Sequence, residues 1–140
     1  MSAATSSPAS ARVLEPERRV LLHGIAWDAY VHMREMLDAS GSHARLTYLA
    51  GALEIMTTSI DHEYLKKLIA RLLEAWATEQ RVAIEAYGAA TFRSEPRQRG
   101  LEPDECYTIG RIRDVPAIAI EVVISSPLID KLKVYAGLGV

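Results

Sequence analysis

The sequence lacks the features that mark several large classes of protein. It holds a single cysteine, Cys106, which excludes an internal disulfide and fits a reducing compartment such as the cytoplasm. No segment approaches the roughly 18 consecutive apolar residues that a transmembrane helix requires. The formal net charge is -2, so the chain has no general positive field. A nucleic-acid partner would therefore have to be bound through a local basic patch or a metal ion.

Common catalytic motifs are also missing. The chain has no GxxxxGK[ST] phosphate loop, no GxGxxG dinucleotide motif and no GxSxG nucleophile elbow. Residues 62–66, HEYLK, begin like the zinc-protease motif HExxH, but Lys66 stands where the second histidine is needed. The four histidines show no other spacing that is typical of metal ligands. The sequence therefore argues against a zinc protease and against the common nucleotide-binding and serine-hydrolase classes.

The length of 140 residues suits one domain with one core. The first residues are small and polar, so we expect residues 1–19 to be a disordered leader and residues 20–140 to form a single domain. The chain stops at YAGLGV, a pattern typical of the exit from a helix. We therefore expect the domain to be short at its C-terminus and to lack its last strands.

Hydrophobic periodicity predicts the first half of the domain. Residues 25–38 have helical spacing, and residues 44–57 read as a hairpin around Ala50-Gly51. In the second strand of that hairpin Leu53 and Ile55 should share one face, with Glu54 on the other. Residues 59–79 give the strongest helical pattern, in which Thr58 and Asp61 have capping-box spacing. We expect Trp76 of this helix, and Tyr135 near the C-terminus, to lie in the core.

The second half is richer in strands. VAIEAYGAATFR reads as two strands broken at Gly88, and LEPDECYTI and VPAIAIEVVI as two more. The last is nearly all apolar, which favours a central place in the sheet. SSPLIDKLKVYAGLG should be a helix that begins at Ser126-Pro127. The predicted fold class is α/β or α+β, with a mixed sheet flanked by helices.

Two carboxylates interrupt the apolar strands. Asp104 follows Pro103 at the start of one strand, and Glu121 stands between apolar residues in the next. A buried carboxylate is costly unless a salt bridge, a raised pKa or a metal ion neutralises its charge. If the two strands are antiparallel neighbours, both side chains can reach one face. Two converging carboxylates suit Mg²⁺ or Mn²⁺, which prefer oxygen ligands. A salt bridge from Glu121 to Lys131, and a turn-capping role for Asp104, remain as structural alternatives.

The order of these segments resembles the PD-(D/E)xK nuclease superfamily and, more narrowly, its Uma-type family of putative restriction endonucleases, formerly a domain of unknown function. The resemblance covers about residues 20–140. It rests on LTYLAGALEIMTTSIDHEYLKKLIARLLEAW for the hairpin and first core helix, GAATFR and LEPDECY for the next strands, VPAIAIEVV for the central strand and IDKLKVYAGLGV for the last helix. It implies a restriction-endonuclease-like fold and a Mg²⁺-dependent (or Mn²⁺-dependent) endonuclease that hydrolyses phosphodiester bonds, with DNA as its partner.

The resemblance also implies roles for particular residues. Asp104 and Glu121 match the metal carboxylates. The superfamily lysine usually stands two residues after the glutamate, where this chain has Val123. In the Uma-type pattern the lysine lies in the next helix, which points to Lys131, with Lys133 as the competing choice.

Auxiliary positions can be placed in the same way. The superfamily often adds an acid from the hairpin or the first core helix, which makes Glu54 and Glu63 candidates, with His62 as a further one. Each also has a plain structural role open to it: Glu54 on the exposed side of a hairpin, and Glu63 as a first-turn acid of its helix. A local basic run could contact nucleic-acid phosphates, or could be a solvated loop: Arg93, Arg97 and Arg99.

The sequence departs from the family pattern at one further place. The family usually reads PDLAIEV before the central strand, and here Ala117 replaces that aspartate. This departure, the displaced lysine and the short C-terminus leave a second function open, a catalytically inactive binding module with a nuclease fold. The short sheet could also leave an open edge through which two copies pair as a homodimer.

Overall fold

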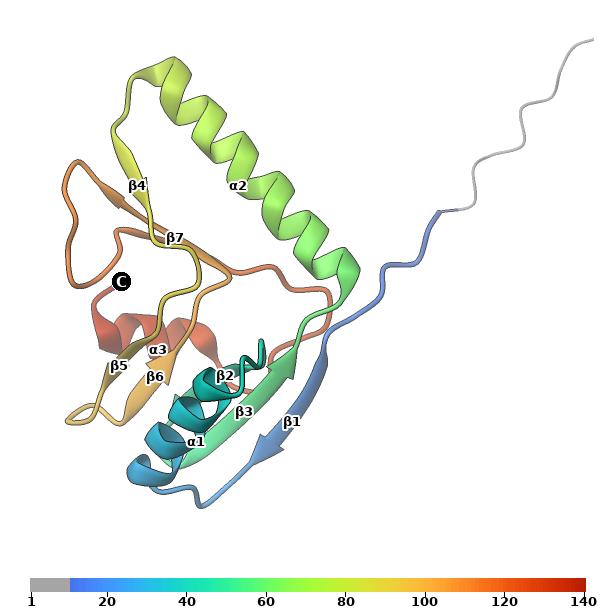
Figure 1. Cartoon of the computed structure of the whole chain (residues 1–140), viewed down its shortest axis with the longest axis vertical. Coiled ribbons are helices and arrows are strands. Elements are labelled where there is room, and N and C mark those ends of the chain that lie inside the picture. Colours follow the sequence, from blue (N-terminus) through green and yellow to red (C-terminus); the bar gives the residue numbers. More distant parts are fainter. Residues whose placement is uncertain (1–10) are drawn as a thin grey trace, which may run out of the picture.

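The computed structural model describes residues 11–140, which form eight strands and three helices (Figure 1). In chain order these are β1 Arg18–Leu22, α1 Trp27–Ala39, β2 Arg45–Leu49, β3 Ala52–Thr57, α2 Ile60–Gln80, β4 Ile84–Ala86, β5 Phe92–Ser94, β6 Arg99–Leu101, β7 Glu105–Ile109, β8 Ile118–Ile120 and α3 Lys131–Leu138. Within this part of the chain, no helix combines the length and apolarity needed to cross a membrane.

The strands form two antiparallel sheets. One has the order β1-β3-β2-β6-β5 and the other the order β4-β7-β8. The α+β class expected from the sequence is confirmed, and the arrangement is consistent with a restriction-endonuclease-like fold. The β2–β3 hairpin is confirmed as well. Its two turn residues, Ala50 and Gly51, both have positive φ, which matches the twist of a tight hairpin.

One face of the five-stranded sheet is covered by α1 (Figure 1). Tyr30 of α1 stacks on Tyr48 of β2 with ring centroids 4.9 Å apart, and both rings are fully buried with Leu46 and Leu53. Gly100 of β6 lies directly under this stack, where a Cβ atom would overlap the Tyr30 ring. The alternation of β2 and β3 therefore directs their large apolar side chains toward α1.

The opposite face of that sheet is covered by α3. Leu101, Ile129, Val134 and Tyr135 form a second buried cluster there, with Ala52 of β3 packed against it. Glu54 lies on the same side of β3 as Ala52, so the predicted separation of Glu54 from Leu53 and Ile55 is confirmed. Glu54 is not on an exposed surface, however: only 1% of it is accessible to solvent.

The helix α2 is present over almost the predicted range, but its orientation corrects two expectations. Its N-cap is Ser59, whose hydroxyl accepts from the His62 N–H at 3.1 Å, and not Thr58. Its buried residues are small or polar, whereas Trp76 is 53% exposed and Leu72 is 62% exposed. Trp76 is therefore not a core residue. Periodicity identifies residues that share a helix face, but it does not show whether another element covers that face.

Several element boundaries also differ from the expected ones. The described fold extends to β1, which begins at Arg18, two residues before the domain boundary expected at residue 20. Residues 1–10 of the expected leader lie outside the described residues. LEPDECYTI is not one strand, because β6 ends at Leu101 and β7 begins at Glu105. Pro103 between them has no N–H to donate to a ladder.

The last strand and helix are shorter than expected. The strand β8 has three residues and lies at the edge of the smaller sheet rather than at a centre. Its apolar character reflects packing, since Ala119 contacts the cluster beneath α3. The helix α3 begins at Lys131 and not at Pro127. Asp130 is the better cap, because its carboxylate accepts from the N–H groups of Leu132 and Lys133.

Leu53 is buried and Leu72 is exposed, and this difference gives a stability prediction. Leu53→Ala is expected to lower the free energy of unfolding by about 2–5 kcal/mol, because Leu53 is fully buried between α1 and the sheet. Leu72→Ala, the same change on the exposed face of α2, is expected to cost less than about 1 kcal/mol. Urea denaturation of both variants measures the difference. Equal losses would contradict the described orientation of α2.

Candidate active site

Asp104 and Glu121 lie opposite one another at the end of a strand pair. The β7–β8 register pairs Glu105 with Ile120, and continuing it by one pair places Asp104 against Glu121. Residues directly opposite on antiparallel strands carry their side chains on the same face. The main chain agrees, because the N–H of Val122 donates to Asp104 Oδ2 at 2.7 Å. The two carboxylates of the sequence prediction are thus brought together.

The Asp104 carboxylate is buried and only half satisfied. Oδ2 accepts from Val122 N–H and lies 3.1 Å from His62 Nε2, whereas Oδ1 is buried without a hydrogen-bond partner among residues 11–140. Burial alone would raise the pKa of Asp104. The hydrogen bonds from His62 and Val122, and the nearby charges of His62 and Lys131, outweigh burial and hold this pKa below its ordinary value. Asp104 is therefore an ionised side chain with one free oxygen.

Glu121 lies on the other side of the pair and is held by α3. Lys131 Nζ donates to Glu121 Oε2 at 2.6 Å, and the Tyr135 hydroxyl donates to Oε1. Burial raises the pKa of Glu121 above its ordinary value, opposed by Lys131 and reinforced by the charge of Asp104. Asp104 acts on Glu121 in this way because the two carboxylates lie close together. Glu121 and Lys131 also line a pocket of about 320 Å³ at the start of α3.

The two candidate lysines have different environments. The Lys131 side chain is 7% exposed and contacts Glu121, whereas the Lys133 side chain is 70% exposed and lies 3.9 Å from Asp130. They are two residues apart on α3, so they point in different directions around the helix. Lys131 belongs to the carboxylate cluster and Lys133 does not.

His62 connects the cluster to a carboxylate that the sequence did not single out. Its Nε2 lies 3.7 Å from Glu17 Oε1 as well as 3.1 Å from Asp104. Burial lowers the pKa of His62, but the hydrogen bond to Asp104 and the charges of Asp104 and Glu17 raise it above its ordinary value. His62 is fully buried at the first turn of α2, where the helix begins beside the sheet. It therefore acts as a buried bridge between two carboxylates.

Glu17 fastens the segment after β8 to the N-terminal part of the fold. Its side chain is fully buried and accepts from Ile124 N–H at 3.0 Å, and from the N–H and hydroxyl of Ser125 at 2.6 Å each. Burial raises the pKa of Glu17, but these donors outweigh it and lower the pKa below its ordinary value. Sequence reasoning missed Glu17, which it placed in the leader. The short apolar run at residues 20–22 just after it is the signal for a strand there.

The position of Glu17 leads to a second stability prediction. Glu17→Ala is expected to lower the free energy of unfolding by about 2–4 kcal/mol, because it leaves the N–H groups of Ile124 and Ser125 without an acceptor in a buried region. Glu15→Ala, at an exposed site two residues earlier, is the matched control and should cost less than about 1 kcal/mol. Denaturant titration distinguishes the two. If Glu17→Ala leaves the free energy of unfolding unchanged, the hydrogen bonds from Ile124 and Ser125 to Glu17 do not form in solution.

The auxiliary acids lie at different distances from the cluster. Glu54 is buried and accepts from Arg19 at 2.8 Å and from the Leu128 N–H, so a cation and a main-chain donor already satisfy it. Glu63 is 44% exposed in its side chain and pairs with Lys66 at 2.6 Å. It is 3.6 Å from His62 Nδ1. Within residues 11–140, neither acid forms a hydrogen bond or ion pair with Asp104 or Glu121.

The basic run of the sequence lies around the end of α3. Arg97 donates to the carbonyl of Gly137 and Arg99 to the carbonyl of Lys133, while Arg93 is exposed and lines a pocket of about 480 Å³ with Arg97. Cations at a helix C-terminus are stabilised by the helix dipole. Two of the three arginines thus have a structural role, and a contact to phosphates stays a prediction for all three.

The donor set at Asp104 and Glu121 fits one class of metal ion. Among residues 11–140, no group of three or more His, Cys, Asp or Glu side chains is placed to hold a metal. A structural or catalytic zinc site would need at least three such ligands. Mg²⁺ is commonly held by one or two carboxylates, with water and substrate phosphate completing its shell. The free Oδ1 of Asp104, beside Glu121, is an oxygen of that kind.

Comparison with known families gives one result. The profile of the Uma2 family, described as a putative restriction endonuclease, matches residues 27–140. No curated protein and no solved structure matches the chain. The matched range includes His62, Asp104, Glu121 and Lys131. The chain therefore belongs to the Uma2 family of putative restriction endonucleases.

Proposed function

We propose that this chain is a Mg²⁺-dependent endonuclease that hydrolyses phosphodiester bonds of DNA, with Mn²⁺ able to replace Mg²⁺. The observation that carries the proposal is the pairing of Asp104 with Glu121, with Lys131 on Glu121 and one Asp104 oxygen left free. Family membership supports nuclease activity in general. The metal, the DNA substrate and the residue roles are our own assignments.

In this proposal Asp104 and Glu121 hold the metal ion through carboxylate oxygens. When bound, the ion supplies Lewis acidity toward a phosphate oxygen and lowers the pKa of a bound water. Val122 N–H and His62 fix the orientation of Asp104, so its free oxygen is presented in one direction. Tyr135 does the same for Glu121. Orienting contacts of this kind raise the affinity of a metal site.

Lys131 has two roles in the proposed mechanism. Its ammonium group offsets the charge of Glu121 in the free protein, which allows two carboxylates to lie side by side in a buried place. During hydrolysis the same cation lies where negative charge develops on the phosphate or on the attacking water. Glu121 and Lys131 line the same pocket, whose other walls are mainly apolar, so a phosphate that entered it would meet both side chains.

Substitution of each of the two lysines by methionine tests the proposal. Lys131→Met is expected to lower the rate of plasmid cleavage in Mg²⁺ by about 10²–10³-fold, because it removes a preorganised positive charge. Lys133→Met changes the same residue type on the exposed side of α3 and should leave the rate within about a factor of three. Loss of activity in Lys133→Met alone would overturn the assignment of Lys131.

A second function is favoured by one specific observation. Lys131 and Tyr135 already satisfy both oxygens of Glu121, which is also how a catalytically inactive relative would stabilise a buried acid. Such a protein would bind nucleic acid or a protein partner without metal chemistry. Calorimetric titration with Mn²⁺ tests this second function, because the absence of a specific metal site would exclude the proposed nuclease.

A further inference from the structure

A pocket of about 300 Å³ lies beside the first turns of α2. Its lining combines the loop before β2, the start of β2, the end of β3 and one side of α2: His43, Arg45, Thr58, Glu63 and Lys66. None of these side chains is apolar. Arg45 and Lys66 are basic and Glu63 is acidic, so the lining has an excess of basic groups and of hydrogen-bond donors.

The two cations are held in unusual positions. Lys66 is only 8% exposed, and its ammonium group pairs with Glu63 at 2.6 Å. Arg45 keeps its Nε buried without a hydrogen-bond partner among residues 11–140. A buried N–H of a charged group without an acceptor is costly. Glu63 pairs with Lys66, and the Arg45 Nε has no acceptor among residues 11–140, so an anion in the pocket could supply one.

The shape of the available donors favours a phosphate group. The planar guanidinium of Arg45 can donate two parallel hydrogen bonds to phosphate oxygens, and the ammonium of Lys66 adds a point charge. Thr58, just after β3, also lines the pocket, but its hydroxyl already hydrogen-bonds Glu63. His43 adds a ring nitrogen to the lining. This is the chemistry of a contact to a phosphate backbone rather than to a base edge.

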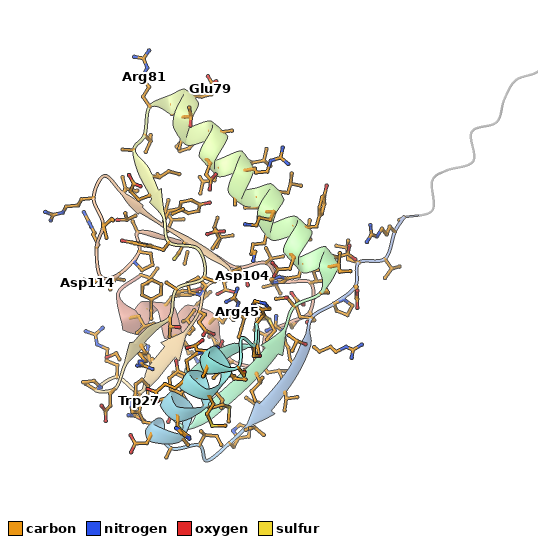
Figure 2. All side chains as sticks on the ribbon, in the orientation of Figure 1. Trp27, Arg45, Glu79, Arg81, Asp104 and Asp114 are labelled. Atoms are coloured by element: carbon orange, nitrogen blue, oxygen red, sulfur yellow. The ribbon has the colours of Figure 1, made fainter. Side chains whose placement is uncertain are left out.

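The pocket is next to the proposed catalytic centre. Glu63, which lines it, is 3.6 Å from His62 Nδ1, and His62 Nε2 is 3.1 Å from Asp104. The imidazole of His62 therefore lies between the pocket and Asp104. Arg45 also alternates with Leu46, so it projects toward the Glu54 side of the sheet and not toward α1. In Figure 2 Arg45 and Asp104 both lie in the central region between α1 and α2.

We propose that this pocket, which we call the Arg45–Lys66 pocket, binds a second phosphate of the nucleic-acid strand whose scissile phosphate lies at Asp104 and Glu121. The inference rests on the proposed nuclease function for the identity of the strand. A nucleic acid carries a phosphate at every nucleotide, so a strand bound at Asp104 and Glu121 has further phosphates on either side of the scissile one. The pocket fixes the register of the strand without reading its bases.

Salt dependence of DNA binding provides the main test. Anisotropy of a fluorescein-labelled duplex is measured in EDTA, so that cleavage does not interfere. Arg45→Gln and Lys66→Gln should each reduce the slope of log affinity against log salt by about one unit. Glu63→Gln should act in the opposite direction and strengthen binding, because it removes the carboxylate from the pocket. Arg81→Gln, at the far end of α2 (Figure 2), is the matched control and should leave the slope unchanged.

Inorganic phosphate provides an independent readout. Titration of the wild type is expected to shift the amide resonances of Thr58 and Lys66 in a ¹⁵N spectrum, and Arg45→Gln should abolish the shifts. If phosphate causes no shifts, and Arg45→Gln and Lys66→Gln both keep the wild-type salt slope, the Arg45–Lys66 pocket does not bind phosphate and the proposal is wrong. If phosphate shifts the amide resonances but the variants leave the salt dependence of DNA binding unchanged, the pocket binds free phosphate and not a nucleic-acid strand. Phosphate shifts and altered slopes without any cleavage would leave the pocket standing while the proposed nuclease function fails.

Discussion

Glu121→Gln is expected to lower Mg²⁺-dependent DNA cleavage by about 10³-fold or more. Glutamine has the shape of glutamate, but its single carbonyl oxygen can replace only one of the two oxygens that accept from Lys131 and Tyr135. It lacks the negative charge, so the pair with Asp104 loses one of its two anionic ligands. The loss of supercoiled plasmid with time measures the rate. Calorimetric titration with Mn²⁺ measures binding at the same site and should show near-stoichiometric binding in the wild type only.

The controls separate the metal site from the fold. Glu85→Gln makes the same change at an exposed residue of β4, in the same sheet, and should keep both activity and Mn²⁺ binding. Far-ultraviolet circular dichroism checks that Glu121→Gln is folded. Cleavage at the wild-type rate by folded Glu121→Gln would refute the proposed mechanism. Mn²⁺ binding by the wild type without cleavage would leave a metal-binding module that is not a nuclease.

Arg34→Met is expected to lower the free energy of unfolding by about 3–5 kcal/mol, a large part of the stability of a domain of this size. Arg34 is 4% exposed and donates to Glu102 and to the Ala44 carbonyl. Glu102 is also 4% exposed and accepts from the Leu46 N–H. Removing Arg34 leaves the Glu102 charge buried with its main cationic partner gone, so denaturant unfolding should show a lower midpoint.

The pH dependence of this loss has a definite sign. Burial already raises the pKa of Glu102 above its ordinary value, opposed by Leu46 N–H and by the charges of Arg34 and Arg45. Without Arg34 the pKa should rise further. Protonation then removes the uncompensated charge, so the difference between wild type and Arg34→Met should shrink as the pH falls.

Two further variants check the cause. Arg34→Met/Glu102→Gln should be more stable than Arg34→Met alone at neutral pH, because the neutral amide can still accept from Leu46. Asp38→Asn tests the other partner of Arg34. Asp38 has a side chain that is 64% exposed, so this change should cost less than about 1 kcal/mol. A cost below about 1 kcal/mol for Arg34→Met would contradict the buried pair.

The sequence pattern alone predicted those parts of the fold that depend on residues close together in the chain. The Ala50-Gly51 hairpin follows from the residues that a tight turn requires, and the length of α2 follows from its helical period. The opposition of Leu53 and Glu54 follows from the geometry of any strand. Each of these depends on neighbours within a few residues, so the sequence contains the whole of the physical cause.

The candidate site was partly visible for a different reason. Asp104 and Glu121 stand out because a charge among apolar residues is costly, whatever the fold around it. That argument identifies an anomaly but not its solution. The β7–β8 register brings the two carboxylates together, and the helical position of Lys131 separates it from Lys133. Both of these facts depend on how strands and helix are packed.

The sequence by itself therefore determined the α+β class, the hairpin, the long helix, the family and the anomalous carboxylate pair. Only the tertiary structure decided that the apolar stripe of α2 with Trp76 faces solvent, and that Glu17 binds the segment 108 residues later at Ser125. It also decided that His62 lies between Asp104 and Glu17. The physical reason is that hydrophobic periodicity, and the free-energy cost of a charge among apolar residues, depend on residues close together in the chain. The partner of a buried charge depends on long-range packing.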